Sequence, residues 1–488
     1  MFFQPSLIFS LSTLLLGATT ALECSPASIP QPDVLGATIL DLQASEAHNY
    51  SAYSLGPGSN DGGRYTVSFC HVTVVHTHPG WNDTVTTQGF AAASTDGGVP
   101  QPPGAITTIA TDLSWALSSE GNVDWFLLEN YAYKATGDMA EIGKQITQSY
   151  YGRLAEYSYF NGCSGGGRQG LAMAQRFPEA FDGILAVAPA INIETFIPAA
   201  FWPTLVMNLH EVYPSPCEID GFVSAAVEAC DGLDGIKDGI ISMPHLCNVT
   251  AFDFIGHTYT CNGTQHSLSS SSAKVVQAAW SVSGKEGYPG LNKDATLSSS
   301  SITTECSGNG TCHSPGIPLA GNWISYLVAK DPTLSLADMT EAEFFQFLAE
   351  SKTDYASMLA ANNPDVSEFN ANGGKLIAWQ GLADEVIPPG GLVDYYAQVL
   401  EQDATAQDFF RYFQAPGVGH CFGGPGPVPN TALAQLMDWV ERGIAPDTLH
   451  ATRGTNNTSR DLCPYPLQQR YVGGDPRNAT SFTCAKAV

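Results

Sequence analysis

Positive charge is scarce in this chain, with 20 lysines and arginines against 47 aspartates and glutamates among 488 residues. The formal net charge of −27 gives a surface that repels phosphate backbones and anionic lipid headgroups. We therefore expect no nucleic-acid partner and no membrane partner. The negative charge falls as carboxylates are protonated, which suits an acidic medium.

Long apolar runs are missing as well. The N-terminal apolar stretch, residues 7–17, is shorter than the roughly 20 residues that a membrane-spanning helix needs. Small residues follow it and allow cleavage after Ala21, although no basic residue precedes it. We predict a signal peptide over residues 1–21 and a secreted, extracellular mature protein.

Cysteines and glycosylation sequons agree with secretion. The 12 cysteines are an even number, which suits disulfide bonds in an oxidising compartment. An apolar content of 44% and a charged content of 14% fit a globular chain. Eight Asn-x-Ser/Thr sequons predict a glycoprotein, at Asn49, Asn82, Asn248, Asn262, Asn309, Asn456, Asn457 and Asn478.

The first part of the chain, residues 22–191, alternates strand-like and helix-like patterns. Residues 65–77 alternate as a strand does, and residues 105–117 and 139–154 have helical periodicity. A short aromatic strand (156–160), a helix (170–177) and a buried strand (183–190) then follow. Strand, helix and strand in this order predict a parallel α/β sheet.

This alternation fades between residues 192 and 363 and then resumes. The intervening region holds six of the 12 cysteines and two serine-rich runs, which predicts an inserted, disulfide-stapled domain. Strands are expected again at 375–380 and 408–417, followed by an amphipathic helix that ends at Gly443, a plausible C-cap. Residues 364–488 therefore read as the second part of the α/β core.

A catalytic serine is predicted from "GCSGG", residues 162–166, which fits G-x-S-x-G with a strand before it and a helix after it. On such a turn the hydroxyl of Ser164 is exposed. The backbone N–H of Gly165 can stabilise the negative charge that develops on an attacked carbonyl. The alternative is a glycine-rich loop that binds an anion at a helix N-terminus.

A base and an acid are expected after later strands, in the chain order Ser, Asp, His. "LIAWQGLADEVIPP" supplies Asp384 and "YFQAPGVGHCF" supplies His420. His420 would take the proton of Ser164, and Asp384 would orient the imidazole. The alternatives are a helix-capping Asp384, a structural His420, and Glu385 as the acid in place of Asp384.

These segments resemble the fungal tannase/feruloyl esterase family. "CSGGGRQG", the aspartate of "GLADEVIPP" and "GHC" are similar to its CS-D-HC pattern, and "GFAAASTDGG" and "CDGLDGIKDGI" are similar too. The resemblance implies an α/β-hydrolase core with a large inserted lid domain. It also implies a Ser164–His420–Asp384 triad and a Cys163–Cys421 disulfide.

The activity implied is that of a secreted serine esterase acting on phenolic acid esters of plant origin, feruloyl or galloyl. Aromatic residues of the lid could line an acyl pocket or belong to its core: Phe196, Phe201, Trp202 and Trp323. A lipase or peptidase on the same fold stays possible, because G-x-S-x-G does not select the acyl substrate. We expect no organic cofactor and leave the oligomeric state open.

A calcium-binding loop is the other site that the resemblance implies, at residues 230–240. The ligands would be the side chains of Asp231, Asp234 and Asp238 and the carbonyls of Ile236 and Ile240. The spacing is not that of an EF-hand, and Asp-Gly turns without a metal are the alternative. The ion would be structural, and Cys230 and Cys247 flank the loop and could staple it.

One segment departs from the family pattern. The family carries a strand and a glycine-rich loop where this chain passes from Thr84 and Val85 to Gln88 and Gly89. A second oxyanion donor is expected there, so either a neighbouring loop substitutes or the chain is catalytically impaired or binding-only.

Eight cysteines remain besides Cys163, Cys421, Cys230 and Cys247. We expect Cys24, Cys70, Cys463 and Cys484 in disulfides and take Cys217 as a tentative partner for Cys261. The pairing of Cys306 and Cys312 is left open.

Overall fold

The computed structural model describes residues 22–34, 38–53, 64–77, 83–87, 93–95, 97–99, 112–281, 288–308, 311–454 and 457–486. The predicted signal peptide and the sequons at Asn82, Asn309 and Asn456 lie outside these residues. Of the other sequons, Asn248, Asn262, Asn457 and Asn478 are exposed. Within the described ranges, each helix is too short or too polar to cross a membrane.

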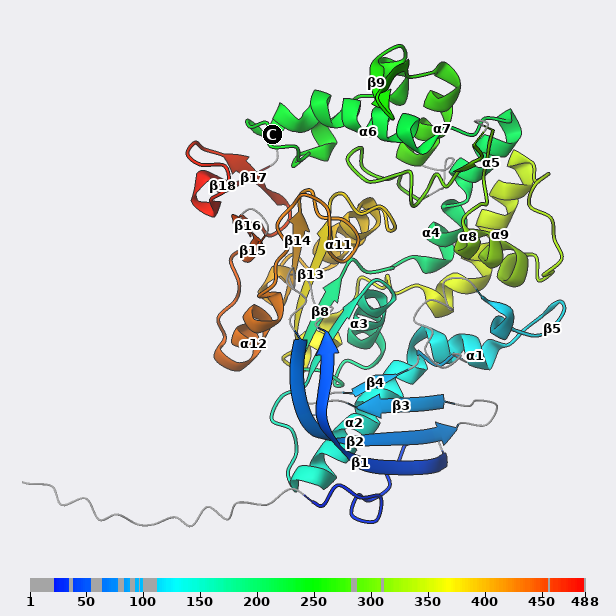
Figure 1. Ribbon diagram of the computed structural model, residues 1–488. Helices are drawn as coiled ribbons and strands as arrows, with labels where there is room; N and C mark the ends of the chain where they lie inside the picture. The colour runs from blue at the N-terminus through cyan, green and yellow to red at the C-terminus, as the bar shows by residue number, and fades with distance from the viewer. Residues whose placement is uncertain are drawn as a thin grey trace, which may run out of the picture.

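A four-stranded parallel sheet forms the centre of the molecule (Figure 1). Its strands lie in the order β14, β13, β8, β7, with β7 at Tyr159–Cys163, β8 at Gly183–Val187, β13 at Lys375–Gly381 and β14 at Phe410–Ala415. Helix α3 (Gly165–Arg176) joins β7 to β8, and α11 (Gly390–Gln402) joins β13 to β14. The predicted α/β class is thereby confirmed.

Both faces of this sheet are buried, which explains why its strands are almost continuously apolar. Ile184 and Leu376 face α3 and α11, where they pack with Leu171 and Leu392. Their neighbours Leu185 and Ile377 point to the opposite face, because side chains alternate along a strand. Helix α12 (Ala432–Arg442) covers that face and ends at Gly443 with φ 69°, as predicted.

The chain between β8 and β13 is mainly helical and occupies the upper and right-hand part of Figure 1, in green to yellow. Two small hairpins interrupt the helices. Its helices are α4 (Ile193–Ala199), α5 (Trp202–His210), α6 (Pro216–Cys230), α7 (Ser270–Trp280), α8 (Pro318–Asn322), α9 (Glu341–Leu359) and α10 (Ser367–Ala371). The hairpins are β9 (Thr258–Cys261) with β10 (Thr264–Ser267), and β11 (Glu305–Cys306) with β12 (Cys312–His313).

Local sequence sets the limits of these helices. Ser215 caps α6 through the N–H of Glu218, and Pro216 occupies the first turn, where its missing N–H costs nothing. Thr340 and Glu343 form a capping box at the start of α9.

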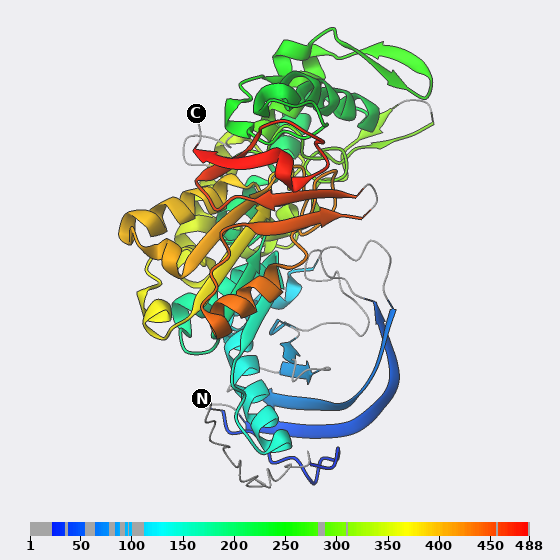
Figure 2. The ribbon, with the colours of Figure 1, turned by 90° about the vertical axis from the view of Figure 1, so that its left-hand side faces the viewer.

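An antiparallel sheet at the N-terminus lies apart from the parallel sheet. Its strands are β1 (Thr38–Tyr53), β2 (Arg64–Thr77), β3 (Asp83–Thr87) and β4 (Ala93–Thr95). Figure 2 shows the long β1–β2 ribbon as an arc at the bottom and right, with its concave side towards the rest of the molecule. Helix α2 (Ala135–Tyr151), predicted at 139–154, packs Ile142 and Ile146 against Val72 and Val74 of β2.

The prediction of a helix at 105–117 is wrong for residues 112–117, which are the part of this range that the structure describes. Ser114–Ala116 is a single 3₁₀ turn, followed by the hairpin of β5 (Leu117–Ser119) and β6 (Asn122–Val123). The side chain of Asp112 accepts the N–H of Ser114, and Gly121 turns the hairpin at φ 77°. The apolar residues whose spacing suggested a helix are buried by this turn instead: Leu113 and Ala116 belong to a hydrophobic cluster.

Short elements complete the fold. Helix α1 (Trp125–Glu129) precedes α2, and two hairpins follow α12. These hairpins are β15 (Leu449–Arg453) with β16 (Thr458–Leu462), and β17 (Leu467–Tyr471) with β18 (Phe482–Lys486).

Candidate active site

Ser164 lies on the turn between β7 and α3, in a backbone conformation with φ 64° and ψ −120°. Residues other than glycine rarely adopt such a backbone conformation. It costs about 1–3 kcal/mol and persists only where the surrounding structure imposes it. Two hydrogen bonds impose it here, since the carbonyl of Ser164 accepts the N–H groups of Arg168 (3.0 Å) and Ala190 (3.1 Å). The sharp turn separates the side chain of Ser164 from the strand that precedes it.

Glycines make this turn possible and leave room beside it. A Cβ at Gly162 would lie 2.6 Å from the backbone of Gly166, so no larger residue fits there. A Cβ at Gly165 or Gly166 would meet no atom within 4 Å. The first turn of α3, whose first N–H groups have no partner within the helix, is therefore open on its Cβ side next to Ser164.

Asp384 and His420 come together at the same edge of the sheet, after β13 and β14. The Nδ1 atom of His420 lies 3.1 Å from each carboxylate oxygen of Asp384. The Asp384 side chain is fully buried and that of His420 is 17% exposed. The edge where parallel strands end thus holds the serine, the histidine and the aspartate.

The Asp384 carboxylate is held by its own loop. Its Oδ1 accepts the N–H groups of Val386 (2.9 Å) and Ile387 (2.8 Å), and the amide of Gln380 donates to its Oδ2 (3.3 Å). These bonds fix the plane that the carboxylate presents to the imidazole. Asp384 is not a helix cap, because the next helix, α11, begins at Gly390 with Pro389 at its N-cap position.

Glu385, the alternative acid, contacts the backbone of His420 and not its imidazole ring. Its Oε2 accepts the backbone N–H of His420 at 3.0 Å, not a ring nitrogen. Glu385 therefore holds the loop that carries the histidine, while Asp384 orients the ring. Sequence reasoning found the residue but had no signal for this backbone contact.

A disulfide joins the serine turn to the histidine loop. Cys163 pairs with Cys421 across 258 residues of sequence, with their Cα atoms 5.9 Å apart. Each cysteine is the immediate neighbour of a candidate catalytic residue. The bridge therefore limits how far Ser164 and His420 can separate.

The structure pairs all 12 cysteines. The other disulfides are Cys24–Cys70, Cys217–Cys261, Cys230–Cys247, Cys306–Cys312 and Cys463–Cys484. The tentative Cys217–Cys261 pair is among them, and Cys306 pairs with Cys312 across a six-residue separation.

Comparison with known proteins shows which family the chain is similar to. The family model described as tannase and feruloyl esterase matches residues 60–485. A probable feruloyl esterase of Arthroderma benhamiae is 34% identical over 514 aligned residues, covering 94% of this chain and 93% of the relative. The tannase of Aspergillus oryzae is 27% identical and covers 92% and 90%.

Solved structures agree. The tannin acyl hydrolase from Aspergillus niger matches with a TM-score of 0.82 and 26% identity, over 95% of both chains. The chain belongs to the tannase and feruloyl esterase family. It is accordingly a carboxylic ester hydrolase with an α/β-hydrolase-like fold.

The departure from the family pattern falls between β3 and β4 of this esterase. The alignment with the Arthroderma protein is longer than the 488 residues of the chain, so that relative has residues that this chain lacks. The second oxyanion donor is expected in the family segment that this chain lacks or in a neighbouring loop, and residues 88–92, next to that point, lie outside the described residues.

The predicted calcium loop of the esterase contains Asp231, Asp234 and Asp238, whose carboxylates have different partners. Both oxygens of Asp231 accept backbone N–H groups, from Asp238 (3.0 Å), Gly239 (3.0 Å) and Ile240 (3.3 Å). Asp234 accepts the N–H of Ile236 (3.1 Å). The loop is thus a preformed turn, and Asp231 and Asp234 are buried within it.

Whether this loop can bind a cation depends on the carboxylate oxygens of Asp238 and on the backbone carbonyls. One oxygen of Asp238 pairs with Arg460 at 2.9 Å, and the other is buried without a hydrogen-bond partner. Burial raises the pKa of Asp234 and of Asp238. In the described part of the chain, no three His, Cys, Asp or Glu side chains form a metal-binding group. A cation here would therefore need backbone carbonyls among its ligands, as the prediction includes.

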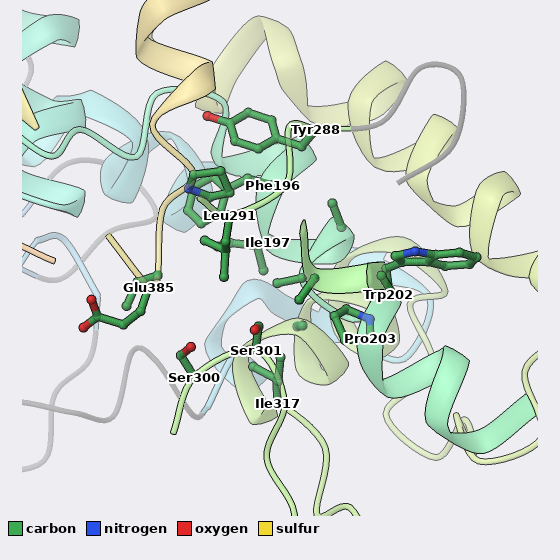
Figure 3. A pocket seen from close by; sticks show the side chains of 18 of the residues that line it. Phe196, Ile197, Trp202, Pro203, Tyr288, Leu291, Ser300, Ser301, Ile317 and Glu385 are labelled. Atoms are coloured by element: carbon green, nitrogen blue, oxygen red, sulfur yellow. The ribbon is translucent and has the colours of Figure 1, made fainter. Parts of the chain in front are cut away.

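A cavity of about 310 Å³ adjoins the loop that follows Asp384 (Figure 3). One wall comes from Glu385, Val386 and Pro388, and the others come from the segment between β8 and β13. Of the four aromatic residues predicted either to line an acyl pocket or to belong to the lid core, Phe196 and Trp202 line this cavity. Phe201 and Trp323 belong to the core of that segment.

Asp294 lies in the segment between β8 and β13, close to the Asp384 loop in the fold. Two residues before it, the side-chain amide of Asn292 donates to the carbonyl of Leu382 at 2.8 Å. The carboxylate of Asp294 is buried, with the backbone N–H groups of Asp294 and Ile241 close to it. Burial raises the pKa of this carboxyl from its ordinary value of 3.8 to about 6. The folded protein consequently holds this proton more tightly than the unfolded chain does.

This difference predicts how stability changes with pH. The contribution of protonated Asp294 is fully present below about pH 4 and is lost as the pH rises through about 6. We expect Asp294→Asn to exceed the wild type in unfolding free energy by about 3 kcal/mol near pH 7 and to match it near pH 4. Urea unfolding at both pH values measures this, with the exposed Asp220→Asn as control. An equal difference at both pH values would contradict it.

Proposed function

We propose that this chain is a secreted serine esterase that hydrolyses esters of phenolic acids, feruloyl or galloyl, through an acyl-enzyme. The observation that carries the proposal is the Asp384–His420 pair, which the Cys163–Cys421 bridge holds next to the strained turn of Ser164. The names of the relatives, a probable feruloyl esterase and a tannase, support the substrate class.

The chemistry runs through three side chains of this site. Ser164 Oγ attacks the ester carbonyl carbon while His420 Nε2 takes its proton, and Asp384 stabilises the imidazolium that forms. The carbonyl oxygen gains negative charge, which the Gly165 N–H at the start of α3 is placed to stabilise. The bond to the alcohol then breaks as His420 protonates the leaving oxygen. Water, deprotonated by His420, releases the acid and restores Ser164.

We assign residues 192–363 to a lid domain, with residues 22–191 and 364–488 as the two parts of the core. This assignment is supported by the place of the cavity, whose walls come from that segment and from the Asp384 loop. A lid in this position would exclude water from the acyl group, which strengthens the electrostatic stabilisation of the transition state.

We further propose that the protein is exported and glycosylated. Six disulfides support an oxidising compartment, and the four exposed sequon asparagines of the described chain can accept glycans. The acidic composition suits an acidic medium, in which the buried Asp294 is protonated.

Calcium is proposed as a structural ion of the lid. Asp231, Asp234 and Asp238, with the carbonyls of Ile236 and Ile240, would hold it and neutralise the carboxylates that the loop brings together. The unpaired, buried oxygen of Asp238 supports this ligand set.

We expect Ca²⁺ to raise the melting temperature of the chelator-treated protein by about 3 °C or more, because ligand binding to the folded state adds stability. Asp234→Asn should lose this response, whereas Asp220→Asn, which removes an exposed carboxylate of the same domain, should keep it. Differential scanning calorimetry with Ca²⁺ or Mg²⁺ measures the effect. A melting temperature that does not respond to Ca²⁺ in the wild type would leave the loop as a metal-free turn.

Turnover by the purified protein tests the proposed activity. Methyl ferulate or methyl gallate should be hydrolysed, and a peptide and a long-chain triglyceride should not. Hydrolysis of the peptide or triglyceride alone would favour a peptidase or lipase on this fold. Turnover of none of the four would favour a binding-only protein and overturn the proposal.

A further inference from the structure

The loop that carries His420, residues 416–423, is supported from two sides. The loop after β13 holds one side, because Ala383 donates its N–H to the carbonyl of Val418 at 3.0 Å. The other side meets the chain that follows α6, and the meeting point is Gly417. The second support therefore comes from the segment inserted between β8 and β13, which lies far from His420 in sequence.

Ile240 makes this second contact, three residues before His420 along the loop. A Cβ at Gly417 would lie 2.9 Å from Cγ1 and 3.0 Å from Cγ2 of Ile240. Gly417 has φ 67°, a conformation that favours glycine, and Ile240 is 6% exposed. The two γ carbons of Ile240 thus pack on the bare backbone of the histidine loop, where that loop has no side chain of its own.

The position of Ile240 is fixed by its own segment. Its backbone N–H donates to Asp231 Oδ1 at 3.3 Å, and the N–H groups of Asp238 and Gly239 donate to the same carboxylate. Asp238 also pairs with Arg460 of β16 at 2.9 Å. Figure 1 shows the chain after α6, in green, next to the hairpin of β17 and β18, in red. The side chain of Ile240 therefore stands on a backbone that hydrogen bonds hold in place.

We propose that Ile240 is a positioning residue for the triad, whose γ carbons support Gly417 and so set the place of His420 relative to Ser164. The inference rests on the proposed function and deepens it, because it adds a residue of the inserted segment to the support of the base. A displacement of about 1 Å between reacting groups can cost about 100-fold in rate. A small shift of the histidine loop is therefore enough to lower kcat.

Three substitutions separate this contact from packing in general. Ile240→Val keeps both γ carbons and should retain kcat for methyl ferulate within about twofold. Ile240→Leu keeps the volume with one γ carbon, and Ile240→Ala keeps none, so kcat should fall about threefold or more and about tenfold or more. KM should change by less than about twofold, because Ile240 does not belong to the described wall of the cavity beside the Asp384 loop.

Ile241→Ala is the matched control. Ile241 is 1% exposed, and its side chain packs with Cys230 and Cys247 inside the inserted segment. Both alanine variants lose the same atoms from a buried site, so we expect similar falls in melting temperature and measure activity well below both. Only Ile240→Ala should lose kcat. An equal loss in both variants, or no loss in Ile240→Ala, would overturn the proposal; if Ile240→Ala does not fold, the comparison of Ile240→Leu with Ile240→Val decides.

A double-mutant cycle tests whether Ile240 acts through Gly417. Gly417→Ala places a methyl group against the γ carbons of Ile240 and should lower kcat, and Ile240→Ala vacates that space. The combined loss should then be at least about fivefold smaller than the product of the two single losses. The φ of residue 417 strains alanine in both backgrounds, so its effect cancels. Gly417→Ala with Ile241→Ala should give the simple product, and a simple product with Ile240→Ala as well would contradict the coupling.

Labelling of Ser164 by a fluorophosphonate reports on His420 without an ester substrate. Its rate should fall in Ile240→Ala by about the same factor as kcat and should stay at the wild-type value in Ile241→Ala. If the wild type hydrolyses neither methyl ferulate nor methyl gallate, the proposed function is wrong. If it hydrolyses them and Ile240→Ala keeps the wild-type kcat or the wild-type labelling rate, the esterase function stands and the positioning role of Ile240 is wrong.

Discussion

Replacing Ser164 by alanine should lower kcat for methyl ferulate by about 10⁴-fold or more while the protein stays folded. The reaction then loses its covalent route, and the remaining oxyanion donor and binding contacts can only assist direct attack by water. The strained backbone at this position argues for a modest effect on stability. A residue with φ 64° costs free energy in the folded state, and alanine in its place keeps a Cβ in the same space.

Ser298→Ala serves as the control for this substitution, because it removes an exposed hydroxyl far from the turn in sequence. Both variants should have the circular dichroism spectrum of the wild type. If Ser164→Ala keeps more than about a tenth of the wild-type kcat, the reaction does not pass through this serine, and the anion-binding interpretation of the glycine-rich turn gains support.

Removing the Cys163–Cys421 bridge should have the next largest effect, a loss of about 100-fold in kcat by Cys163→Ser with Cys421→Ser. The two cysteines adjoin Ser164 and His420, so the bridge fixes the separation of the nucleophile and its base. A displacement of about 1 Å between reacting groups can cost this factor. The chain-entropy estimate for a loop of this length is roughly 5 kcal/mol of stability, so activity is measured well below the melting temperature.

The double serine variant of Cys306 and Cys312 is the matched control. It also removes one disulfide, but its loop spans six residues on a hairpin of the proposed lid, and the expected loss of stability is about 2 kcal/mol. We expect this control to retain wild-type kcat. Full activity in a folded variant without the Cys163–Cys421 bridge would show that the bridge serves stability alone.

Much of the site could be predicted because its residues are tied to strand ends. G-x-S-x-G between a strand and a helix locates Ser164, and the carboxyl ends of parallel strands meet at one edge of the sheet. Asp384 and His420 follow β13 and β14 and so arrive at that edge. The α/β class followed from the same periodicity.

The contacts that refine the site could not be predicted, because they depend on loop conformation. Nothing in the spacing of Glu385 indicates that its carboxylate accepts the backbone N–H of His420, 35 residues away in sequence.

The wrong helix at 105–117 has a similar cause. The spacing of Leu113, Ala116 and Leu117 fits one face of a helix, but the Asp112 side chain and Gly121 favour a turn and a hairpin. Local hydrogen bonding outweighed periodicity here, because aspartate side chains compete with the helix for backbone N–H groups.

Labelling with a fluorophosphonate tests the central claim most directly, namely that Ser164, activated by His420 and Asp384, performs the esterase chemistry. Peptide mass spectrometry of the inactivated protein should place one adduct on Ser164, and hydrolysis of methyl ferulate should fall in proportion to the labelled fraction. Asp384→Asn should react far more slowly with the same reagent, because its histidine loses the carboxylate that orients it. Full hydrolysis by protein that is completely labelled at Ser164, or inactivation through an adduct on another residue, would contradict the account.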